Sequence, residues 1–346
     1  MDQEYTQRIK KIEGALGKWL PDTPAPAWVG YVCPGLEKKI KPESLKDILA
    51  PGRNMLSRGG KRWRPLLMNL VCESLGGGEA ALPLSPLVEF CHTGSLIHDD
   101  IEDESDERRG KPAVHILYGV DTAINSGAFF YFLASCCIEQ CAEEKKSRIY
   151  RLWADCLRRL HLGQSMDIAW HREVTFVPAI DDYYVMCGLK TGSLARFAAE
   201  LGAYTAGASN ETMHKLGEAA ERLGIGFQIL DDVKNLTTGI PGKMRGDDVV
   251  EGKKSLPVLL FMNKHPDKRD LIFKCFDDAR ESSATITEVE DFIKHLNDAG
   301  VIKEAEEKGL GFLKNAHTVF KTPELYGANA DEKSRNLLAG LVNLIR

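Results

Sequence analysis

Residues 94–103 read GSLIHDDIED, and residues 226–235 read GFQILDDVKN. Each stretch places an Asp pair at the end of an apolar run with helical spacing. On a helix, Asp99 and Asp103 share a face and Asp100 lies beside them. Crowded carboxylates repel one another unless cations neutralise them, and oxygen ligands of this kind suit Mg²⁺, which usually also takes waters and phosphate oxygens. The two stretches therefore predict buried helices whose carboxylates hold a diphosphate through magnesium.

Aspartate doublets by themselves are weak signals. The sequence contains five of them, beginning at positions 99, 181, 231, 247 and 277. Such residues are mostly exposed or cap helices, so we interpret the doublet at 181 as a helix N-cap and the one at 277 as solvated surface. The doublets at 99 and 231 differ because apolar residues flank them, an acid or amide follows the first Asp four residues later, and a basic segment comes next. We therefore assign chemistry to these two.

Helical periodicity recurs along the chain, and alternating strand patterns are nearly absent. Apolar residues follow helical spacing near 3–19, 43–50, 60–75, 82–106, 119–140, 145–171, 181–206, 210–236, 254–264, 267–280, 286–298, 301–319 and 331–345. Many helices with apolar faces predict an all-α fold, a single bundle around a central cavity. We expect one domain over 1–346, with an N-terminal arm and proline-containing linker at 1–42 and a C-terminal helix at 320–346.

The composition argues against a nucleic-acid-binding, membrane-spanning or disulfide-rich protein. The chain has 346 residues, 43% of them hydrophobic, and a net charge of −5, which does not suggest a nucleic-acid partner. It contains no apolar run long enough to cross a bilayer, and its first residues lack the pattern of a signal peptide. The nine cysteines form no C-x-x-C pair, so we expect free thiols, with Cys91, Cys136, Cys137 and Cys187 buried. We expect a cytoplasmic protein.

Basic segments lie near both carboxylate clusters. Residues 60–65 read GKRWRP and place three cations in four positions just before an apolar helix. A helix start already favours anions, so a bound anion would explain cations there, although a solvated basic turn is an equal alternative. Arg108-Arg109 follows the first cluster, Lys243 and Lys253 follow the second, and Lys190 lies between them in sequence. The recurrence of cations beside acidic clusters favours phosphate binding.

In order and spacing, these motifs resemble those of the trans-isoprenyl diphosphate synthases (polyprenyl synthetases), over residues 58 to 257. The resemblance is greatest to geranylgeranyl diphosphate synthase. It implies a magnesium-dependent prenyltransferase that condenses isopentenyl diphosphate with an allylic diphosphate (dimethylallyl, geranyl or farnesyl). It also implies a homodimer and three Mg²⁺ per active site.

The resemblance carries specific roles onto residues of this chain. As metal ligands it implies Asp99, Asp100, Asp103, Asp231 and Asp232, which with Lys190 and Lys253 form the catalytic set. For the isopentenyl diphosphate site it implies Gly60, Lys61, Arg64, His92 and Arg109. For the allylic substrate it implies Arg108, Lys190, Thr191, Gln228, Asn235, Lys243 and Lys253. Asn235 stands where many members have a third Asp; an amide can still bind a metal but lacks the charge.

The implied chemistry explains the concentration of charge. Magnesium and cationic side chains stabilise the departing diphosphate, and a dry cavity protects the allylic cation from water. The double bond of isopentenyl diphosphate attacks that cation, and a proton is then lost. The Gln228 amide oxygen and backbone carbonyls near Lys190 are candidates for stabilising the cation.

Product length depends on bulky residues deeper in the cavity. Gly94 and Ser95 are small where farnesyl-producing relatives often carry aromatic residues. One helical turn rises about 5.4 Å, close to one isoprene unit, so blocking residues one turn deeper would admit about one more unit. Tyr131, Phe132 and His161 match the floor of the eukaryotic-type geranylgeranyl synthases; ordinary core packing is the alternative for the two aromatic residues.

Other functions within and near the family remain as alternatives. They are a farnesyl or longer-chain synthase, a class I terpene cyclase and a non-catalytic partner subunit. A cyclase usually has Asn, Ser or Thr, and Glu at four-residue intervals in the second motif, whereas this chain has Asn235, Gly239 and Lys243. Non-catalytic subunits often lose the metal motifs that are intact here.

Overall fold

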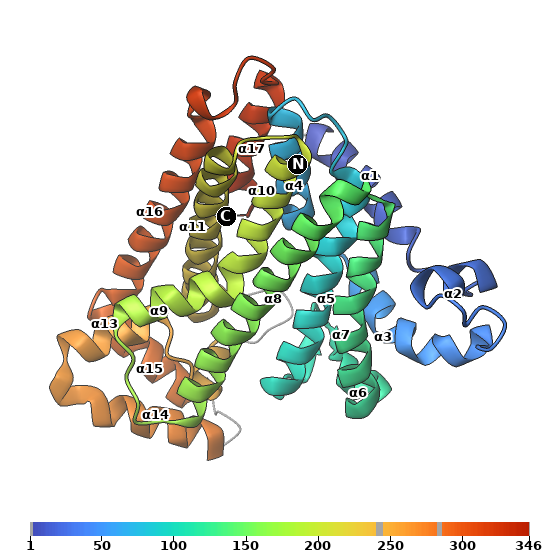
Figure 1. Ribbon diagram of the computed structural model, residues 1–346. Coiled ribbons are helices and arrows are strands. Elements are labelled where there is room, and N and C mark those ends of the chain that lie inside the picture. Colours follow the sequence, from blue (N-terminus) through green and yellow to red (C-terminus); the bar gives the residue numbers. More distant parts are fainter. Residues whose placement is uncertain (1–2, 240–244, 282–285, 346) are drawn as a thin grey trace. The chain divides into compact units, whose positions relative to one another are not determined.

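The computed structural model describes residues 3–239, 245–281 and 286–345, and nearly all of its regular structure is helical (Figure 1). The α-helices are α1 (Gln3–Gly17), α2 (Pro26–Val32), α3 (Lys46–Ser57), α4 (Trp63–Ser74), α5 (Ser85–Glu102), α6 (Val114–Tyr118), α7 (Val120–Ser135), α8 (Glu143–Arg172), α9 (Ile180–Cys187), α10 (Ser193–Thr205), α11 (Asn210–Leu236), α12 (Asp247–Val250), α13 (Leu256–Lys264), α14 (Arg269–Glu281), α15 (Ile286–Asp298), α16 (Val301–Lys321) and α17 (Glu332–Ile345). Short 3₁₀ turns are η1 (Pro42–Leu45), η2 (Leu82–Leu84), η3 (Cys136–Gln140), η5 (Pro266–Lys268) and η6 (Pro323–Leu325), and η4 (Gly188–Gly192) is a π-helical turn. The prediction of an all-α fold is confirmed.

The chain forms two compact units. Unit 1 comprises Met1–Cys156, Arg196–Gly217 and Phe320–Ile345, and unit 2 comprises Leu157–Ala195 and Glu218–Val319. The division falls inside the helices α8, α10, α11 and α16. The single domain over 1–346 stays a prediction.

In unit 1, the helices α5 and α7 pack along each other, and α17 packs along α4 (Figure 1). Phe90 of α5 and Phe130 of α7 are fully buried, with ring centroids 5.3 Å apart. The C-terminal helix α17 is fixed at its start, where the Asp331 amide donates to the Ser74 carbonyl at the end of α4 (3.1 Å). The carboxylate motif at 99–103 therefore lies at the end of a well-buried helix.

Glycines allow α5 and α7 to approach closely. A Cβ added at Gly94 would lie 2.6 Å from the Gly127 carbonyl oxygen of α7. A Cβ added at Gly127 would in turn lie 2.6 Å from Nε2 of His98, which is 3.1 Å from the Ile124 carbonyl. The contact at Gly127 is with a side chain that can move, whereas the contact at Gly94 is with backbone, so helix packing alone accounts for a glycine at 94.

Helix α3 is longer than the sequence predicted. Periodicity predicts a helix over 43–50, but α3 continues through Pro51 and Gly52 to Ser57. Both residues are buried, and the Phe130 ring of α7 occupies the space that a Gly52 side chain would need. Packing of α3 on α7 therefore outweighs the poor helix propensity of the pair.

One short hairpin follows the first carboxylate motif. Strands β1 (Glu107–Arg108) and β2 (Lys111–Pro112) pair antiparallel, and the two residues between them, Arg109 and Gly110, have φ of 55° and 71°. A two-residue turn of this kind requires positive φ at both positions and matches the twist of the strands. The turn folds Arg108 back toward the end of α5.

Unit 2 has its own core, which includes Tyr183, Phe276 and Phe292, all fully buried or nearly so. Helices α9 and α10, predicted as one segment over 181–206, are separated by the π-helical turn η4. Asp181 and Asp182 do not cap α9. Ala179 is the N-cap, and the two carboxylates lie in the first turn, where the helix dipole favours them.

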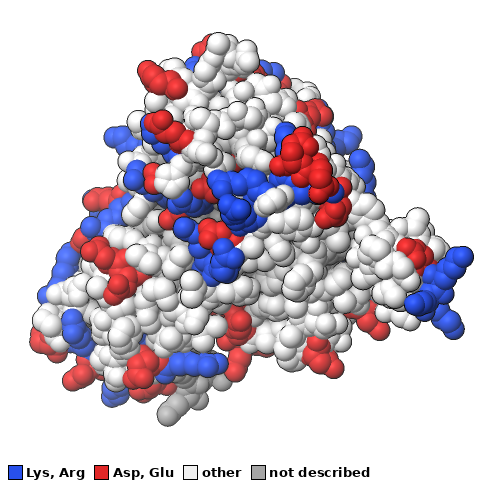
Figure 2. All heavy atoms as spheres, viewed as in Figure 1, with Lys and Arg blue, Asp and Glu red and all other residues white. Residues whose placement is uncertain are grey.

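The surface carries charges of both signs, interspersed on the face shown in Figure 2. Within the described residues, no helix has the length and apolar character needed to cross a membrane. All nine cysteines are free thiols, and Cys91, Cys137 and Cys187 are buried as predicted. Cys136 is half-buried, because it lies in the turn η3 at the end of α7.

Candidate active site

The first carboxylate cluster lies at the C-terminal end of α5 in unit 1. Asp99 and Asp100 are in its last turn and Asp103 is the C-cap. Asp100 is fully buried, whereas the other two are half-buried. Arg108 of the hairpin donates from Nε to Oδ1 of Asp100 (2.6 Å), and its Nη2 lies 3.4 Å from Oδ2 of Asp99. The predicted first motif is therefore assembled, and its negative charge is held against a guanidinium.

A second group in unit 1 concentrates positive charge around Gly60. Arg64, in the first turn of α4, is almost fully buried, and its Nη1 lies 3.3 Å from Nε2 of His92 on α5. Burial and the charges of Arg64 and Arg109 hold the pKa of His92 well below its usual range. The imidazole is therefore neutral and accepts a hydrogen bond from Arg64. Lys61 is exposed, and its Nζ donates to the Ile345 carbonyl (3.2 Å).

The second carboxylate motif lies near the C-terminal end of α11 in unit 2. Asp231 is half-buried and Asp232 is buried. Asp232 accepts hydrogen bonds from the Tyr183 hydroxyl (2.6 Å) and the Gln228 amide (2.9 Å). Burial, together with the charge of Asp248, raises the pKa of Asp232 to about 7. A nearby cation would reverse that effect by favouring the charged carboxylate.

Gln228 also connects the second motif to the π-helical turn. Its Oε1 accepts a hydrogen bond from the Thr191 hydroxyl (2.7 Å), and its Nε2 donates to Asp232. The amide oxygen predicted as a candidate for stabilising the allylic cation is thus engaged by Thr191. Thr191 and Gln228 are brought together as the allylic-site prediction requires.

Lys190 lies in the same turn and pairs with a carboxylate that the sequence analysis did not single out. Its Nζ donates to Oδ2 of Asp167 on α8 (2.5 Å), and Nε2 of His171 lies 2.9 Å from the other oxygen. Burial opposes ionisation of Asp167, but Lys190 and His171 hold its pKa well below the usual range. The π-helical turn is closely packed: a Cβ at Gly163 would overlap the Lys190 amide, and one at Gly224 would lie 2.6 Å from the Gly192 Cα. Single π-helical turns of this type often occur at functional sites.

Lys253 and Asn235 meet around Asp248 of α12. Lys253 Nζ lies 3.1 Å from Asp248 Oδ1 and 3.2 Å from Glu251 Oε2. Asn235 is fully buried; its Oδ1 accepts from the Asp248 amide (3.4 Å) and its carbonyl accepts from the Gly246 amide (3.1 Å). These contacts give Asn235 a role in fixing the segment that carries Lys253. Lys243 lies outside the described residues.

The residues assigned to product length are distributed between the units. In unit 1, Tyr131 of α7 is buried with its ring 5.6 Å from the His98 ring, whereas Phe132 is 64% exposed. Ser95 is half-buried, and its hydroxyl donates to the His92 carbonyl (2.8 Å). His161 is an exposed residue of α8 in unit 2. A common floor built from Tyr131, Phe132 and His161, and a length-determining role for Gly94, stay predictions.

Four buried residues with polar side chains were not predicted from the sequence. They are Glu89, Asp167, Tyr183 and Asp248. Asp248 belongs to one of the five doublets, but no apolar run precedes it. The helical spacing between Asp167 and His171 is the one signal that could have indicated a pair.

The donor atoms in both motifs suit a hard cation. Carboxylate oxygens are the ligands that Mg²⁺ prefers. Arg108 neutralises charge at the first cluster, and burial together with Asp248 raises the pKa of Asp232 at the second, an effect that a bound cation would oppose. As the side chains stand, the part of the chain that the structure describes has no group of three or more His, Cys, Asp or Glu residues arranged around a metal position. Asp100 instead pairs with Arg108. Metal binding would therefore require the side chains of the first cluster to exchange partners.

The sequence and fold have relatives of known activity. The profile of the polyprenyl synthetase family matches residues 46–293. A geranylfarnesyl diphosphate synthase from Aeropyrum pernix is 31% identical over 85% of this chain and 93% of its own length. A geranylgeranyl diphosphate synthase from Methanosarcina mazei is 32% identical over 90% of this chain and 88% of its own.

The fold agrees with these matches. The crystal structure of geranylgeranyl pyrophosphate synthetase from Pyrococcus horikoshii Ot3 superposes with a TM-score of 0.81 at 26% identity, covering 99% of this chain and 96% of that one. The family profile covers both Asp motifs and all the cationic segments described above. This chain belongs to the polyprenyl synthetase family.

Proposed function

We propose that this prenyltransferase joins isopentenyl diphosphate to an allylic diphosphate and that its main product is the C20 compound geranylgeranyl diphosphate. The observation that carries the proposal is the match to the Methanosarcina geranylgeranyl diphosphate synthase over nine tenths of the chain. The two assembled Asp motifs and their neighbouring cations support it, because a diphosphate leaving group needs both kinds of charge.

The carboxylates of the two Asp motifs hold the metal. We assign Asp99, Asp100 and Asp103 of unit 1 and Asp231 and Asp232 of unit 2 as ligands, for three Mg²⁺ in all. Bound Mg²⁺ supplies Lewis-acid stabilisation of the negative charge on the diphosphate. With Mg²⁺ on these carboxylates, Arg108, which now pairs with Asp100, would be available to bind diphosphate oxygens.

Cationic side chains bind and orient the two substrates. Lys190, Lys253, Lys243 and Arg108 hold the allylic diphosphate, with Thr191, Gln228 and Asn235 contributing hydrogen bonds or fixing neighbours. Gly60, Lys61, Arg64, His92 and Arg109 hold isopentenyl diphosphate. Neutral His92 serves this site better than an imidazolium would, because it can accept from Arg64 and so orient the guanidinium.

The reaction forms one C–C bond. The C–O bond of the allylic diphosphate breaks with its electron pair going to the diphosphate, and an allylic cation results. The double bond of isopentenyl diphosphate attacks C1 of that cation, and the proton lost from C2 of the isopentenyl unit passes to the departed diphosphate. The side chains listed above hold the diphosphate during this sequence, which keeps the base beside the proton.

A C25 product is the second candidate. The Aeropyrum relative, named a geranylfarnesyl diphosphate synthase, is as similar to this chain as the Methanosarcina one. Exposure of Phe132 also means that the single chain does not bury that ring as part of a closed floor.

One experiment separates the candidates. The purified full-length protein is incubated with labelled isopentenyl diphosphate, Mg²⁺ and each of dimethylallyl, geranyl and farnesyl diphosphate, and the dephosphorylated products are sized. A dominant C20 product from all three primers supports the proposal. A dominant C15, C25 or longer product refutes the C20 assignment, and a cyclic hydrocarbon would instead support a terpene cyclase.

A further inference from the structure

The backbone around Lys61 has an unusual conformation. Gly59 and Gly60 have φ of 84° and 139°, and Arg62, the N-cap of α4, has φ of 47°. Residues with a Cβ rarely adopt positive φ, so Arg62 must be held in this conformation by other contacts. The segment that carries the proposed diphosphate ligand Lys61 is therefore not a relaxed loop.

The Arg62 side chain makes those contacts. It is 2% exposed, and it donates from Nη2 to the Leu56 carbonyl (2.7 Å) and from Nη1 to the Gly59 carbonyl (3.2 Å). Both carbonyls belong to the end of α3 and the residues after it. The guanidinium thus joins the C-terminal end of α3 to the N-terminal end of α4 and closes the loop between them.

Two carboxylates compensate the buried charge of Arg62. Nη1 lies 2.9 Å from Oε1 of Glu89 on α5, and Nε lies 2.7 Å from Oε1 of Glu13 on α1. Glu89 is as deeply buried as Arg62, whereas the Glu13 side chain is 48% exposed. A buried guanidinium without such partners would be strongly destabilised.

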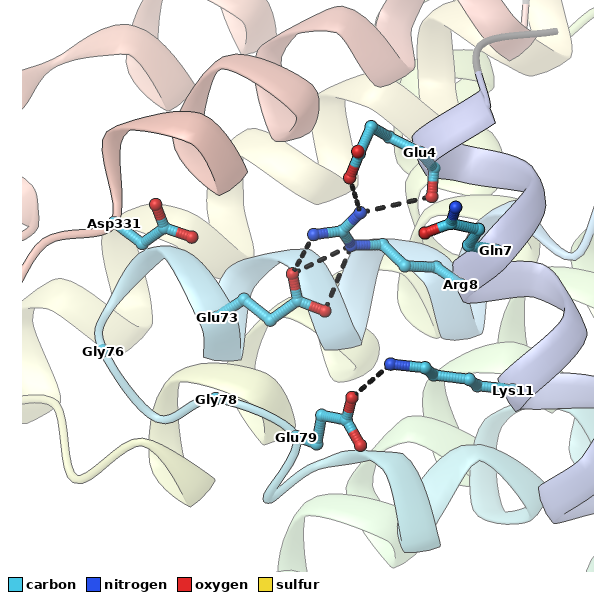
Figure 3. A pocket seen from close by; sticks show the side chains of 9 residues that line it. All are labelled: Glu4, Gln7, Arg8, Lys11, Glu73, Gly76, Gly78, Glu79 and Asp331. Atoms are coloured by element: carbon cyan, nitrogen blue, oxygen red, sulfur yellow. Dashed lines mark hydrogen bonds and ion pairs between the residues drawn. The ribbon is translucent and has the colours of Figure 1, made fainter.

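Helix α1 is placed against α4 and the loop that follows it by further ion pairs. Arg8 lies 2.7 Å from Glu73 near the end of α4, and Lys11 lies 2.5 Å from Glu79. Figure 3 shows both pairs lining a pocket of about 410 Å³, in which the Arg8 guanidinium points toward Glu73 and Glu4. Their positions on α1 bring Glu13 to the opposite end of α4, next to Arg62.

The loop also contacts a proposed ligand on its other side. Arg109 of the hairpin donates to the same Gly59 carbonyl that Arg62 engages. A Cβ added at Gly60 would lie 3.1 Å from Arg109 Nη2 and 3.1 Å from Arg62 Nη1. Gly60 is therefore enclosed by two guanidinium groups, and a shift of Arg62 would alter both the loop and Arg109.

We propose that Arg62, held by Glu89 and Glu13, is a positioning residue for isopentenyl diphosphate. By fixing the carbonyls of Leu56 and Gly59, it sets the backbone from which Lys61 and Arg64 reach the diphosphate. In this role Arg62 does not touch substrate, because its side chain is 2% exposed and four of its five N–H groups already donate inside the protein. The inference rests on the proposed function in taking Lys61 and Arg64 as diphosphate ligands.

The test compares Arg62→Gln, Arg62→Lys and Glu13→Gln in the full-length enzyme. Measured quantities are the KM for each substrate, kcat, the Kd for isopentenyl diphosphate by calorimetry, and the thermal midpoint. Arg62→Gln should raise the KM and Kd for isopentenyl diphosphate roughly tenfold, as expected when a preorganised site must be ordered by its ligand, and leave the allylic KM within about twofold. Arg62→Lys keeps the charge beside Glu89 but cannot donate to two carbonyls and two carboxylates at once. It should recover thermal stability without recovering the KM.

Glu13→Gln keeps the proposal testable if Arg62→Gln does not fold, because Glu13 is half-exposed. It should raise the KM for isopentenyl diphosphate about threefold, in the same direction as Arg62→Gln but less, because one of the four partners weakens. Glu211→Gln is the matched control: it makes the same change in an exposed ion pair of α11, with Lys215, and should leave both KM values unchanged.

Lys61→Ala separates failure of this inference from failure of the proposed function. If Lys61→Ala raises the KM for isopentenyl diphosphate but the Arg62 and Glu13 variants do not, the positioning role is wrong and the proposed site stands. If Lys61→Ala affects only the allylic KM or neither, the assignment of this loop to isopentenyl diphosphate is wrong, and the positioning role fails with it. Equal changes of both KM values in Arg62→Gln would indicate general structural damage and would also contradict the inference.

Discussion

The protonation state of an ionisable residue in this protein depends on the charges that lie around it. His92 is surrounded by arginines, and its pKa is held well below its usual range. Asp167, which is buried, is placed between Lys190 and His171, and its pKa is lowered. The first residue is therefore kept neutral and the second charged, which fits a hydrogen-bond acceptor and a fixed counterion, respectively.

His92 should make stability sensitive to mild acid. In the unfolded chain it protonates below about pH 6.5, whereas in the folded protein it stays neutral to much lower pH, so folding loses stability as the pH falls through 6.5. His92→Gln should remove this part of the dependence. Urea midpoints between pH 7.5 and 5.5 should fall less steeply for the variant than for the parent. Parallel pH profiles would show that His92 is protonated in the folded protein.

Single carboxylates in the Asp motifs should be essential for turnover. Asp99→Ala and Asp231→Ala should each lower kcat by about three orders of magnitude or more, because each removes a ligand of the charge that stabilises the leaving group. Circular dichroism should remain that of the parent, and chelation of Mg²⁺ should abolish activity of the parent reversibly. Near-normal turnover of either variant would exclude the assigned metal site. Asp277→Ala, in a surface doublet, is the control.

The neighbours of each carboxylate also explain which site residues could be predicted from the sequence. Asp99 and Asp231 could be selected because apolar runs precede them and cations follow. Asp167 and Glu89 could not, because their importance depends on partners distant in sequence, Lys190 and Arg62. The sequence around a single acidic residue on a helix does not indicate which distant residue will pair with it.

At the scale of elements, helical periodicity located the longer helices but missed the short helices α2, α6 and α12 and misplaced several helix ends. Packing on α7 extends α3 through Pro51-Gly52, beyond the predicted segment 43–50, and the change from α9 through a π-helical turn to α10 had no visible signal. Positive φ at Arg109-Gly110 creates a two-residue hairpin that is too short for a strand pattern to reveal. Contacts between elements therefore determine where these helices end more than local propensity does.

Helix α5 should not tolerate a side chain at Gly94. Gly94→Ala places a Cβ 2.6 Å from the Gly127 carbonyl, which forces α5 and α7 apart and should lower the free energy of unfolding by about 1–3 kcal/mol. Gly14→Ala in α1 is the matched control. No atom lies within 4 Å of its added Cβ, so the change should stabilise the protein by about 0.5–1 kcal/mol. Urea unfolding of both variants measures the difference, and equal effects would contradict the close approach of the two helices.

Product length should respond to the other cavity residues. Ser95→Phe should shift products from C20 toward C15, because Ser95 is half-buried and precedes Asp99 by one helical turn. Phe132→Ala and His161→Ala test the predicted floor: if these side chains, which are exposed in the single chain, line the cavity of the active enzyme, the truncations should shift products toward C25 or longer. Sizing the dephosphorylated products measures the chain length for each variant. If both truncations leave chain length unchanged while turnover persists, these residues are not part of the floor.

At the scale of the whole molecule, unit 1 exposes an unusual set of apolar side chains on α6 and α7. The residues concerned are Ile116, Leu117, Val120, Ile124 and Phe132, each at least 48% exposed. Apolar side chains grouped on adjacent helices commonly mark an interface with another protein.

We expect these helices to form the contact of a homodimer. Sedimentation at micromolar concentration should give twice the chain mass of 38.4 kDa. Ile124→Lys should shift the equilibrium toward monomer, because a charge buried at an apolar interface is unfavourable, whereas Leu271→Lys on α14 should not. A parent protein that sediments as a monomer would refute the dimer.

The close approach of Gly94 to Gly127 also constrains how product length can change during evolution. Relatives named for C20 and C25 products show that chain length varies among proteins similar to this one. A mutation at 94 alone meets a backbone carbonyl, so it can persist only if α7 shifts through a second change. Ser95 already carries a side chain and is half-buried. Across descendants of this sequence, position 94 should therefore change only together with residues that set the packing of α5 on α7, whereas position 95 should vary independently.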